Sequence, residues 1–598
     1  MLNSVQNYGR LLSPSSSVRT FTTTGSNAAE SHAIENQEKP QHFKDWPNAQ
    51  GFDTSYEERT PVELQVEGHI PVYAAGVLFR TGLGPRSVDC GDKGIYKSNH
   101  WFDNFAQVHR FQIHAPSTEG GKVQVTYNSR LTSDGLIEKV RKAGRLDGMT
   151  FAAKYEPCKT LFQKLQSVFA PAVWMLPKPP SAPNEANIGV TMSVNLPGYS
   201  PTGEAAQVPR DDSKIKSFCT RTDAATVQFL DSETLEPIGL ARQGVLHPDL
   251  TGPVSGAHAK SDPVTGDVYN FNLQFGGQGT FRVFRTSAST GKTSILATVS
   301  HTTAYLHSLF LTENYVVLCI WNSHFRAGGM AILLKNNLIE AMEYNDKTPA
   351  KWFVIDKRTA DEGGQGVVAT YESEPFFGFH SVNAYEHTSV DGVKHIIADI
   401  PVYQNLEVLN AFYFDNILSD SPTAAQVQGR WGDALAPRYR RYRLPDVPGE
   451  PQKETRKAVV EFELARNDTP ELPSLNWSVF TKKHRYVYGV CDSGKSTFAD
   501  SLLKLDLEDF SVKRWSVHGQ TAGEPIFIAD PDSTDEDGGV LLTVVLDGIA
   551  GKSYLLALNA KDLTEMGRAN VDGVIGFGFH GLHTKAGLGT NMSSNADY

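Results

Sequence analysis

The chain contains 598 residues and carries a formal net charge of −11, with 40% hydrophobic and 21% charged residues. This composition excludes a disordered chain and supplies enough apolar surface for a substantial core. The negative charge, without a clustered basic face, argues against a nucleic acid as the partner, because a phosphate backbone is bound by positive charge. Length alone allows either one large all-β unit or several domains.

The first 50 residues are expected to form a disordered tail, since they lack apolar periodicity and are rich in Ser, Thr and Asn. We therefore predict a single domain over residues 51–598. Within the tail, residues 1–27 include Arg10 and Arg19 but no acidic residue, a pattern shared with mitochondrial transit peptides. A cytosolic protein is the expectation, and mitochondrial targeting by residues 1–27 is the alternative.

The cysteines and the apolar runs indicate neither a secreted nor a membrane-spanning protein. The five cysteines are scattered, odd in number and form no C-x-x-C pair, which favours unpaired thiols in a reducing compartment. The apolar run at residues 315–321 is far too short to cross a bilayer.

One segment could contact a lipid surface without crossing it. Residues 160–177 read TLFQKLQSVFAPAVWMLP, and four apolar residues fall on one helical face: Leu161, Leu165, Val168 and Phe169. Such a face can rest on a membrane or a lipid droplet. It can equally pack on the protein as ordinary core, and both interpretations stay open.

From about residue 61 onward the chain repeats one pattern, a short strand followed by a turn with Asp or Asn and then another strand. The side chains of Asx, Ser and Thr can bond the turn backbone locally, so these segments are predicted to be hairpins. Many irregularly spaced hairpins are typical of a β-propeller, in which small antiparallel sheets surround an axis. Five segments show the pattern clearly: 227–241, 260–275, 281–299, 502–517 and 555–571.

Residues 489–496, GVCDSGKS, match the G-x-x-x-x-G-K-[ST] pattern of a phosphate-binding loop. Such a loop needs a helix after it, whose N-terminal N–H groups face the phosphate. Here Leu503, Leu505 and Leu507 alternate with polar residues, and a period of two indicates a strand. We therefore predict an ordinary hairpin turn at residues 492–495.

Four histidines lie beside strand-like runs: His258, His307, His380 and His580. Their wide separation excludes a local zinc-finger or H-E-x-x-H site. In a propeller, however, the starts of the innermost strands of different blades meet at the axis, so distant histidines can converge. A histidine on an apolar strand is otherwise most often a hydrogen-bonded core residue. Spacing alone does not favour these four over the other histidines nearby: His301, His387 and His583.

Several ordered motifs resemble those of the carotenoid cleavage oxygenases. They are IPVYAAGVLFRTGLGP, HWFDNFAQVHRFQI, HAKSDPVTGDVYNF, ELPSLN, GEPIFIADP with DEDGGVLLTVVLD, and FHGLH, which together span residues 70–583. The resemblance implies an all-β, seven-bladed β-propeller with a helical and loop cap over a non-haem iron(II) site. It also implies that four histidines ligate the iron: His258, His307, His380 and His580.

The same resemblance implies three carboxylates behind the histidines, each accepting a ring N–H. Glu471 in ELPSLN and Glu524 in GEPIF match two of these positions. At the third, this chain offers Asp223 in place of the usual Glu, one methylene shorter. An accepting carboxylate fixes the tautomer of the ligand histidine, orients its ring and makes it more basic.

The family reaction splits the double bond of a polyene or stilbene with dioxygen and yields two carbonyls. The resemblance implies no cofactor besides iron, because the cleaved alkene supplies the electrons that reduce dioxygen. We expect a small apolar polyene and dioxygen as the partners. The oligomeric state is not predicted.

Within the family, NSRLTSDGLIE and GLGPRSVDCGDKGIYKSNHWFD resemble fungal members that cleave torulene on the way to neurosporaxanthin. Torulene is therefore the expected substrate. Stilbene-cleaving members hold a small phenol with a Tyr and a Lys, and here Lys139 lies several positions beyond the expected place, which weakens the stilbene alternative. A propeller that binds partners without catalysis is the alternative from another class.

Overall fold

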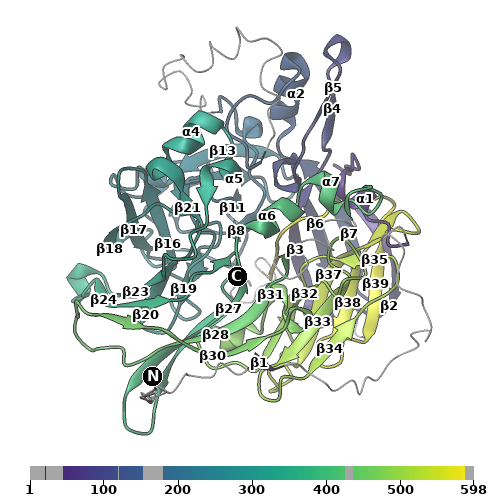
Figure 1. Cartoon of the computed structure of the whole chain (residues 1–598). Helices are drawn as coiled ribbons and strands as arrows, with labels where there is room; N and C mark the ends of the chain where they lie inside the picture. Colours follow the sequence, from purple (N-terminus) through teal and green to yellow (C-terminus); the bar gives the residue numbers. More distant parts are fainter. Residues whose placement is uncertain (1–19, 22–44, 119, 153–179, 425–434, 586–598) are drawn as a thin grey trace, which may run out of the picture.

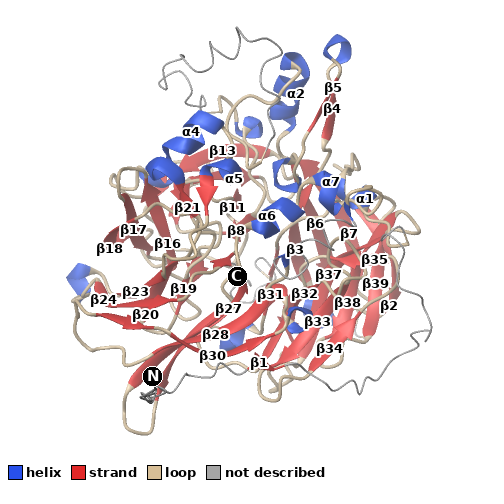
Figure 2. Cartoon of the chain, viewed as in Figure 1, coloured by secondary structure: helices blue, strands red, loops and turns tan. Residues whose placement is uncertain are grey.

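Short antiparallel strands carry most of the regular structure in the computed structural model, which describes residues 20–21, 45–118, 120–152, 180–424 and 435–585. The sheets are arranged around a centre, so the fold is all-β and β-propeller-like (Figure 1). Figure 2 shows that the labelled α-helices lie on one side of the strands, in the upper part of the view. Nothing is described for residues 160–177 or for most of residues 1–27, so the predictions made for these segments lie outside the described residues.

Five separate sheets of four to six strands form blades. The first contains β8 (Thr191–Val194), β11 (Phe218–Arg221), β12 (Thr226–Leu230) and β13 (Pro237–Arg242). The second contains β14 (Val254–Ser255), β15 (Lys260–Ser261), β16 (Val268–Gln274), β17 (Gly279–Thr286) and β18 (Thr293–His301). The third contains β19 (Phe310–Leu311), β20 (Tyr315–Ile320), β23 (Ala350–Asp356), β24 (Val367–Ser373) and β29 (Thr455–Lys457).

The fourth sheet contains β1 (Thr20–Phe21), β25 (Phe377–Gly378), β26 (Asn383–Thr388), β27 (Lys394–Tyr403), β28 (Arg438–Leu444) and β30 (Val459–Leu464). The fifth contains β31 (Glu471–Ser474), β32 (Tyr486–Cys491), β33 (Ser501–Asp506) and β34 (Val512–Trp515). Three two-stranded ribbons lie outside these blades: β4 (Ser87–Asp89) with β5 (Ile95–Lys97), β9 (Gly198–Tyr199) with β10 (Ala205–Ala206), and β21 (His324–Phe325) with β22 (Met342–Glu343).

A ten-stranded sheet combines strands from residues 62–131 with strands from residues 520–584. It contains β35 (Gln520–Ala522), β36 (Ile526–Ala529), β37 (Gly539–Asp547), β38 (Lys552–Asn559), β39 (Glu565–Asn570), β2 (Val62–Gly68), β7 (Gln124–Leu131), β6 (Ala106–His114), β3 (Gly76–Leu83) and β40 (Gly581–Thr584). The prediction of seven blades is wrong for these residues, which form five separate blades. The physical reason is β2, whose two halves pair with β39 and with β7 and so make one continuous sheet.

All five predicted hairpins are confirmed as antiparallel pairs, from β12 with β13 to β38 with β39. The turn after β12 shows the expected mechanism, because the Asp231 carboxylate accepts the backbone N–H groups of Glu233 and Thr234 at 3.0 and 2.8 Å. Local side-chain bonds therefore set the strand ends.

The segment that matches a phosphate-binding loop is also a hairpin, as predicted. Strands β32 and β33 pair in antiparallel register, with Cys491 opposite Ser501. The buried Asp500 carboxylate accepts the backbone N–H groups of Ser493 and Lys495, the latter at 2.8 Å. The N–H groups that would face a phosphate in a nucleotide-binding loop are thus occupied by an acid of the same turn.

The helices of the described residues are short: α1 (Ala49–Phe52), α2 (Asp134–Ala143), α4 (Met330–Lys335), α5 (Leu338–Ala341), α6 (Glu407–Ala411) and α7 (Phe414–Ile417). None of them has the length and apolar character needed to cross a membrane.

A few residues of the expected tail are described. Strand β1 pairs in parallel with β30, and Trp46 and Asn48 are buried. The side chain of Asn48 donates to Thr497 and to the carbonyl of Ile417, which anchors this segment to two distant parts of the chain.

Candidate metal centre and adjoining cavity

Four histidines from four different sheets meet near the centre of the fold. His258 lies between β14 and β15, His307 precedes β19, His380 follows β25, and His580 immediately precedes β40. All four are buried, and each contributes one ring nitrogen to a group in which the atoms lie within 4.8 Å of one another. The backbone reinforces the cluster, since the His258 N–H donates to the His307 carbonyl at 3.1 Å.

Three carboxylates hold three of these rings from behind. The Nδ1 atom of His307 lies 2.8 Å from Asp223 Oδ1, that of His380 lies 2.8 Å from Glu471 Oε2, and that of His580 lies 2.8 Å from Glu524 Oε1. A carboxylate partner requires the proton on Nδ1, which leaves the lone pair on Nε2. No described carboxylate bonds His258.

The shorter Asp223 does reach its histidine. Both of its oxygens approach His307 Nδ1, at 2.8 and 3.0 Å. Two tyrosines support the arrangement: Tyr305 donates to Asp223 at 2.8 Å, and Tyr403 donates to Glu471 at 2.9 Å. No motif pointed to these tyrosines; the only signal for Tyr305 is its place two residues before His307.

Burial disfavours the protonated form of three of the four histidines. It lowers the pKa of His258 and His580 well below the ordinary value and that of His380 to about 4. Burial also raises the pKa of Glu524 to about 7, and the nearby Arg80 opposes this rise. Neutral imidazoles are the form that binds metals.

The inward nitrogens meet the test for a metal site. Within the described residues, the buried Nε2 atoms of His258, His380 and His580 have no hydrogen-bond partner. A buried polar atom without a partner is costly unless a ligand compensates it. Imidazole nitrogen is a suitable donor for iron and several other transition metals.

The other candidate histidines do not join this group of four. His583 is buried on β40, where its Nε2 atom lies 3.0 Å from the Ala74 carbonyl oxygen. His387 is on β26 and its ring stacks with that of His395. His301 ends β18.

A cavity of about 590 Å³ opens beside the centre, with His307, His380 and His580 in its wall. Several of the helices contribute to the wall through Leu136, Ile332, Leu338, Val408 and Ala411. Many aromatic rings line it: Trp101, Phe102, Phe151, Phe275, Phe325, Phe379, Phe412, Phe498 and Phe579. An apolar wall with a few convergent polar groups is typical of a site for an apolar small molecule.

The fold and the site define a class: a β-propeller-like protein with a buried four-histidine centre that opens on an aromatic cavity. The family model described as retinal pigment epithelial membrane protein, RPE65, matches residues 51–585. The chain therefore belongs to the RPE65 family of carotenoid oxygenases, and the resemblance seen in the sequence is confirmed.

The curated relatives cover nearly the whole chain. A carotenoid dioxygenase of Neurospora crassa is 38% identical over 588 residues, 93% of this chain and 94% of that protein. A torulene dioxygenase of Gibberella fujikuroi is 38% identical over 565 residues, 91% of this chain and 94% of that protein. A solved structure of a Synechocystis apocarotenoid oxygenase variant has a TM-score of 0.67 at 19% identity, covering 91% of this chain and 99% of the other, which supports the fold.

Proposed function

We propose that this protein is an iron(II)-dependent dioxygenase that cleaves one double bond of a carotenoid, with torulene as the substrate. The observation that carries the proposal is the group of four buried histidine nitrogens, within 4.8 Å of one another, at the wall of an aromatic cavity. The similarity to fungal carotenoid and torulene dioxygenases supports the substrate class.

The proposed ligands are His258, His307, His380 and His580, and iron(II) bound there would supply a position for dioxygen. Four neutral imidazoles leave the charge of a divalent ion uncompensated, unlike the commoner set of two histidines and a carboxylate. The compensating negative charge would then come from the carboxylates that accept the Nδ1 protons of three ligands: Asp223, Glu471 and Glu524. These residues orient the rings and make three of the four ligands more basic.

The cavity wall would hold the polyene by shape and apolar contact. Phe379 illustrates the arrangement, since its ring lies 5.9 Å from the His307 ring and 6.0 Å from the His380 ring. A rigid polyene held against such a wall presents one double bond to the centre, and fixed geometry of this kind is a large source of rate.

The cavity gives no support to a stilbene substrate. No lysine is among the described residues that line it. Lys139 lies on α2, half exposed, and forms an ion pair with Glu185 at 2.7 Å. The alternative of a partner-binding propeller without catalysis has no specific observation in its favour.

The substrate is tested by offering torulene, β-carotene, a shorter apocarotenal and resveratrol separately to purified protein with iron(II), and by chromatography of the aldehyde products. We expect torulene to be cut fastest and at a single double bond near its acyclic end. Faster cleavage of resveratrol than of any carotenoid would contradict the substrate assignment. Full iron occupancy without cleavage of any of the four would contradict the proposed activity.

The remaining sequence predictions stay as proposals. They are the single domain from residue 51, the cytosolic location with mitochondrial targeting as the alternative, the lipid contact through residues 160–177, and the absence of a nucleic-acid partner. A helical cap over the centre is a further proposal, supported by the helical residues in the cavity wall.

A further inference from the structure

One buried arginine contacts the residue whose carboxylate holds His580. Arg80 lies on β3 and is only 3% exposed. Its Nη1 atom donates to the backbone carbonyl of Glu524 at 2.9 Å and lies 3.4 Å from the Oε2 atom of the same residue. A buried cation is costly unless a nearby acid compensates it, so the guanidinium and Glu524 form a pair in which each partner needs the other.

The side chain of Glu524 is held at every polar position. Its Oε1 atom accepts the Nδ1 proton of His580 at 2.8 Å, and the Gly581 N–H donates to Oε2 at 2.6 Å. Arg80 bonds the main chain from which this side chain starts and also approaches Oε2. Because both the main chain and the carboxylate are fixed, the ring of His580 is kept in one orientation.

Two consecutive residues of β3 act on this one histidine. The Thr81 N–H donates to the His580 carbonyl at 2.9 Å, and the Thr81 hydroxyl oxygen accepts the His580 N–H at 3.0 Å. Thr81 thus fixes the backbone of His580, whereas Arg80 contacts the acid that holds its ring. The same strand therefore determines both the position and the orientation of a proposed ligand.

Two glycines leave room for the guanidinium. A Cβ atom at Gly581 would lie 2.6 Å from Arg80 Nη1, and one at Gly523 would lie 2.8 Å from Arg80 Nη2. Neither glycine has a positive φ, so backbone conformation does not require glycine at these positions. The close approach of Arg80 does require it.

The support of His580 differs from that of the other two histidine–carboxylate pairs. Asp223 and Glu471 each accept a hydroxyl from a tyrosine that lines the large cavity. Within the described residues, Glu524 alone of the three carboxylates pairs with an arginine, and Arg80 does not line that cavity. The contribution of Arg80 can therefore be tested without any substrate.

We propose that Arg80 is a positioning residue of the metal centre, which holds Glu524 in place and through it aims the His580 ring at the metal. The inference rests on the proposed ligand set and extends it to a residue that contacts no ligand histidine directly. Without the guanidinium, the Glu524 main chain loses a donor and the carboxylate can turn away from His580. Loss of an outer partner of this kind commonly weakens metal binding about 10- to 100-fold.

The first test is titration of the metal-free full chain with cobalt(II), whose visible absorption reports the geometry of its ligands. Arg80→Met removes the guanidinium and keeps a long side chain. It should weaken cobalt binding about 10-fold and shift the absorption bands. Arg80→Lys keeps the charge and one donor, so it should recover part of the affinity and a spectrum closer to that of the native protein.

A double-mutant cycle separates positioning from general packing. Glu524→Ala removes the side chain that Arg80 is proposed to position. Adding Arg80→Met to Glu524→Ala should therefore cost no further cobalt affinity, so the two losses are not additive. A merely structural role of Arg80 would lower the affinity by the same factor in the presence and in the absence of the Glu524 side chain.

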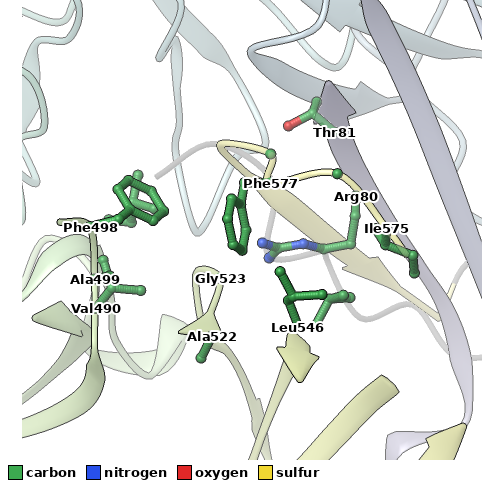
Figure 3. A pocket seen from close by; sticks show the side chains of 14 residues that line it. Arg80, Thr81, Val490, Phe498, Ala499, Ala522, Gly523, Leu546, Ile575 and Phe577 are labelled. Atoms are coloured by element: carbon green, nitrogen blue, oxygen red, sulfur yellow. The ribbon is translucent and has the colours of Figure 1, made fainter. Parts of the chain in front are cut away.

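Gly523→Ala is a milder variant that displaces the guanidinium without removing it. Apart from Arg80 Nη2, the nearest atom to the added methyl group would be the Val544 carbonyl oxygen at 3.5 Å. Figure 3 shows the guanidinium close to Gly523, beside a cavity of about 30 Å³ that gives it room to move. This variant should fold and bind cobalt several-fold more weakly. Gly244→Ala is the matched control, because Gly244 is exposed and its nearest neighbouring atom would lie 3.7 Å away.

Native cobalt affinity and an unchanged spectrum in folded Arg80→Met would overturn the inference, as would additive losses in the cycle. If Arg80→Met does not fold, Arg80→Lys and Gly523→Ala decide, and native binding by both would overturn it. A native chain that binds neither cobalt nor iron would contradict the metal centre itself, and the inference with it. Normal metal binding without cleavage of any polyene would contradict only the proposed activity.

Discussion

At the scale of single residues, the centre depends on pairs in which a histidine faces inward and an acid holds it from behind. Sequence spacing could not select these histidines, because His258 and His580 are 322 positions apart and converge only through the blade geometry. The family resemblance selected them. Asp223 is shorter than the Glu that the family resemblance implies, but the backbone holds it close enough for both carboxylate oxygens to reach His307 Nδ1. No sequence motif indicated that Tyr305 and Tyr403 donate hydrogen bonds to Asp223 and Glu471.

The ligand set makes a direct prediction about metal content. Protein purified without oxygen should hold roughly one iron per chain, and His307→Ala or His580→Ala should lose most of it, because three ligands remain and water enters. Elemental analysis measures this. His583→Ala is the control and should keep its iron, since His583 bonds the Ala74 carbonyl instead. Iron retained at full level in either ligand variant would show that the set is wrong.

The carboxylate behind His307 makes a graded prediction. Asp223→Ala should weaken metal binding about 10- to 100-fold, because His307 loses the acceptor that orients its ring. Asp223→Glu should restore most of the affinity, as the resemblance suggests Glu at this place. Titration of the metal-free protein with iron(II) measures both. Equal affinities of the Ala and Glu variants would mean that Asp223 only fills space.

At the scale of secondary-structure elements, the hairpins were the feature that the sequence predicted best. Alternating polarity and Asx turns specify them locally, so all five marked segments pair as expected. The pairing of β2 with both β39 and β7 could not be predicted from the sequence. Strand β39 lies some 500 residues further along the chain, and no local sequence pattern specifies the register of strands so far apart.

The hairpin between β32 and β33 predicts unequal effects on stability for two of its residues, Asp500 and Lys495. Asp500→Ala should lower the free energy of unfolding by about 1–3 kcal/mol, because several turn N–H groups lose their buried acceptor. Lys495→Ala should change it by less than about 0.5 kcal/mol, since Lys495 is an exposed turn residue. Denaturant unfolding distinguishes the two.

The Lys495→Ala variant also tests whether residues 489–496 bind a nucleotide. Lys495→Ala should keep full cleavage activity, and the native protein should not bind magnesium and ATP. Tight ATP binding that disappears in Lys495→Ala would contradict the hairpin assignment.

At the scale of the whole molecule, the last described strand closes the fold. Strand β40 pairs with β3 and directly follows His580. A chain ending after residue 573 should therefore bind no iron and should be digested quickly by protease. The matched control ends after residue 585 and keeps β40 and all four histidines, so it should bind iron as the full chain does. Iron bound by the shorter chain would place the centre elsewhere.

The closing strand has a consequence for synthesis of the protein in the cell. At about 5–20 residues per second, the ribosome needs roughly 25 to 100 seconds to synthesise the segment between β3 and β40, and His580 emerges only at the end of that segment. Until then, one side of β3 has no partner, although all eight residues of this strand are buried in the finished protein. An unpaired apolar strand edge is a template for aggregation. The nascent chain is thus expected to need chaperone protection longest at β3, and a ribosome stalled before residue 580 would release a product that quality control must remove.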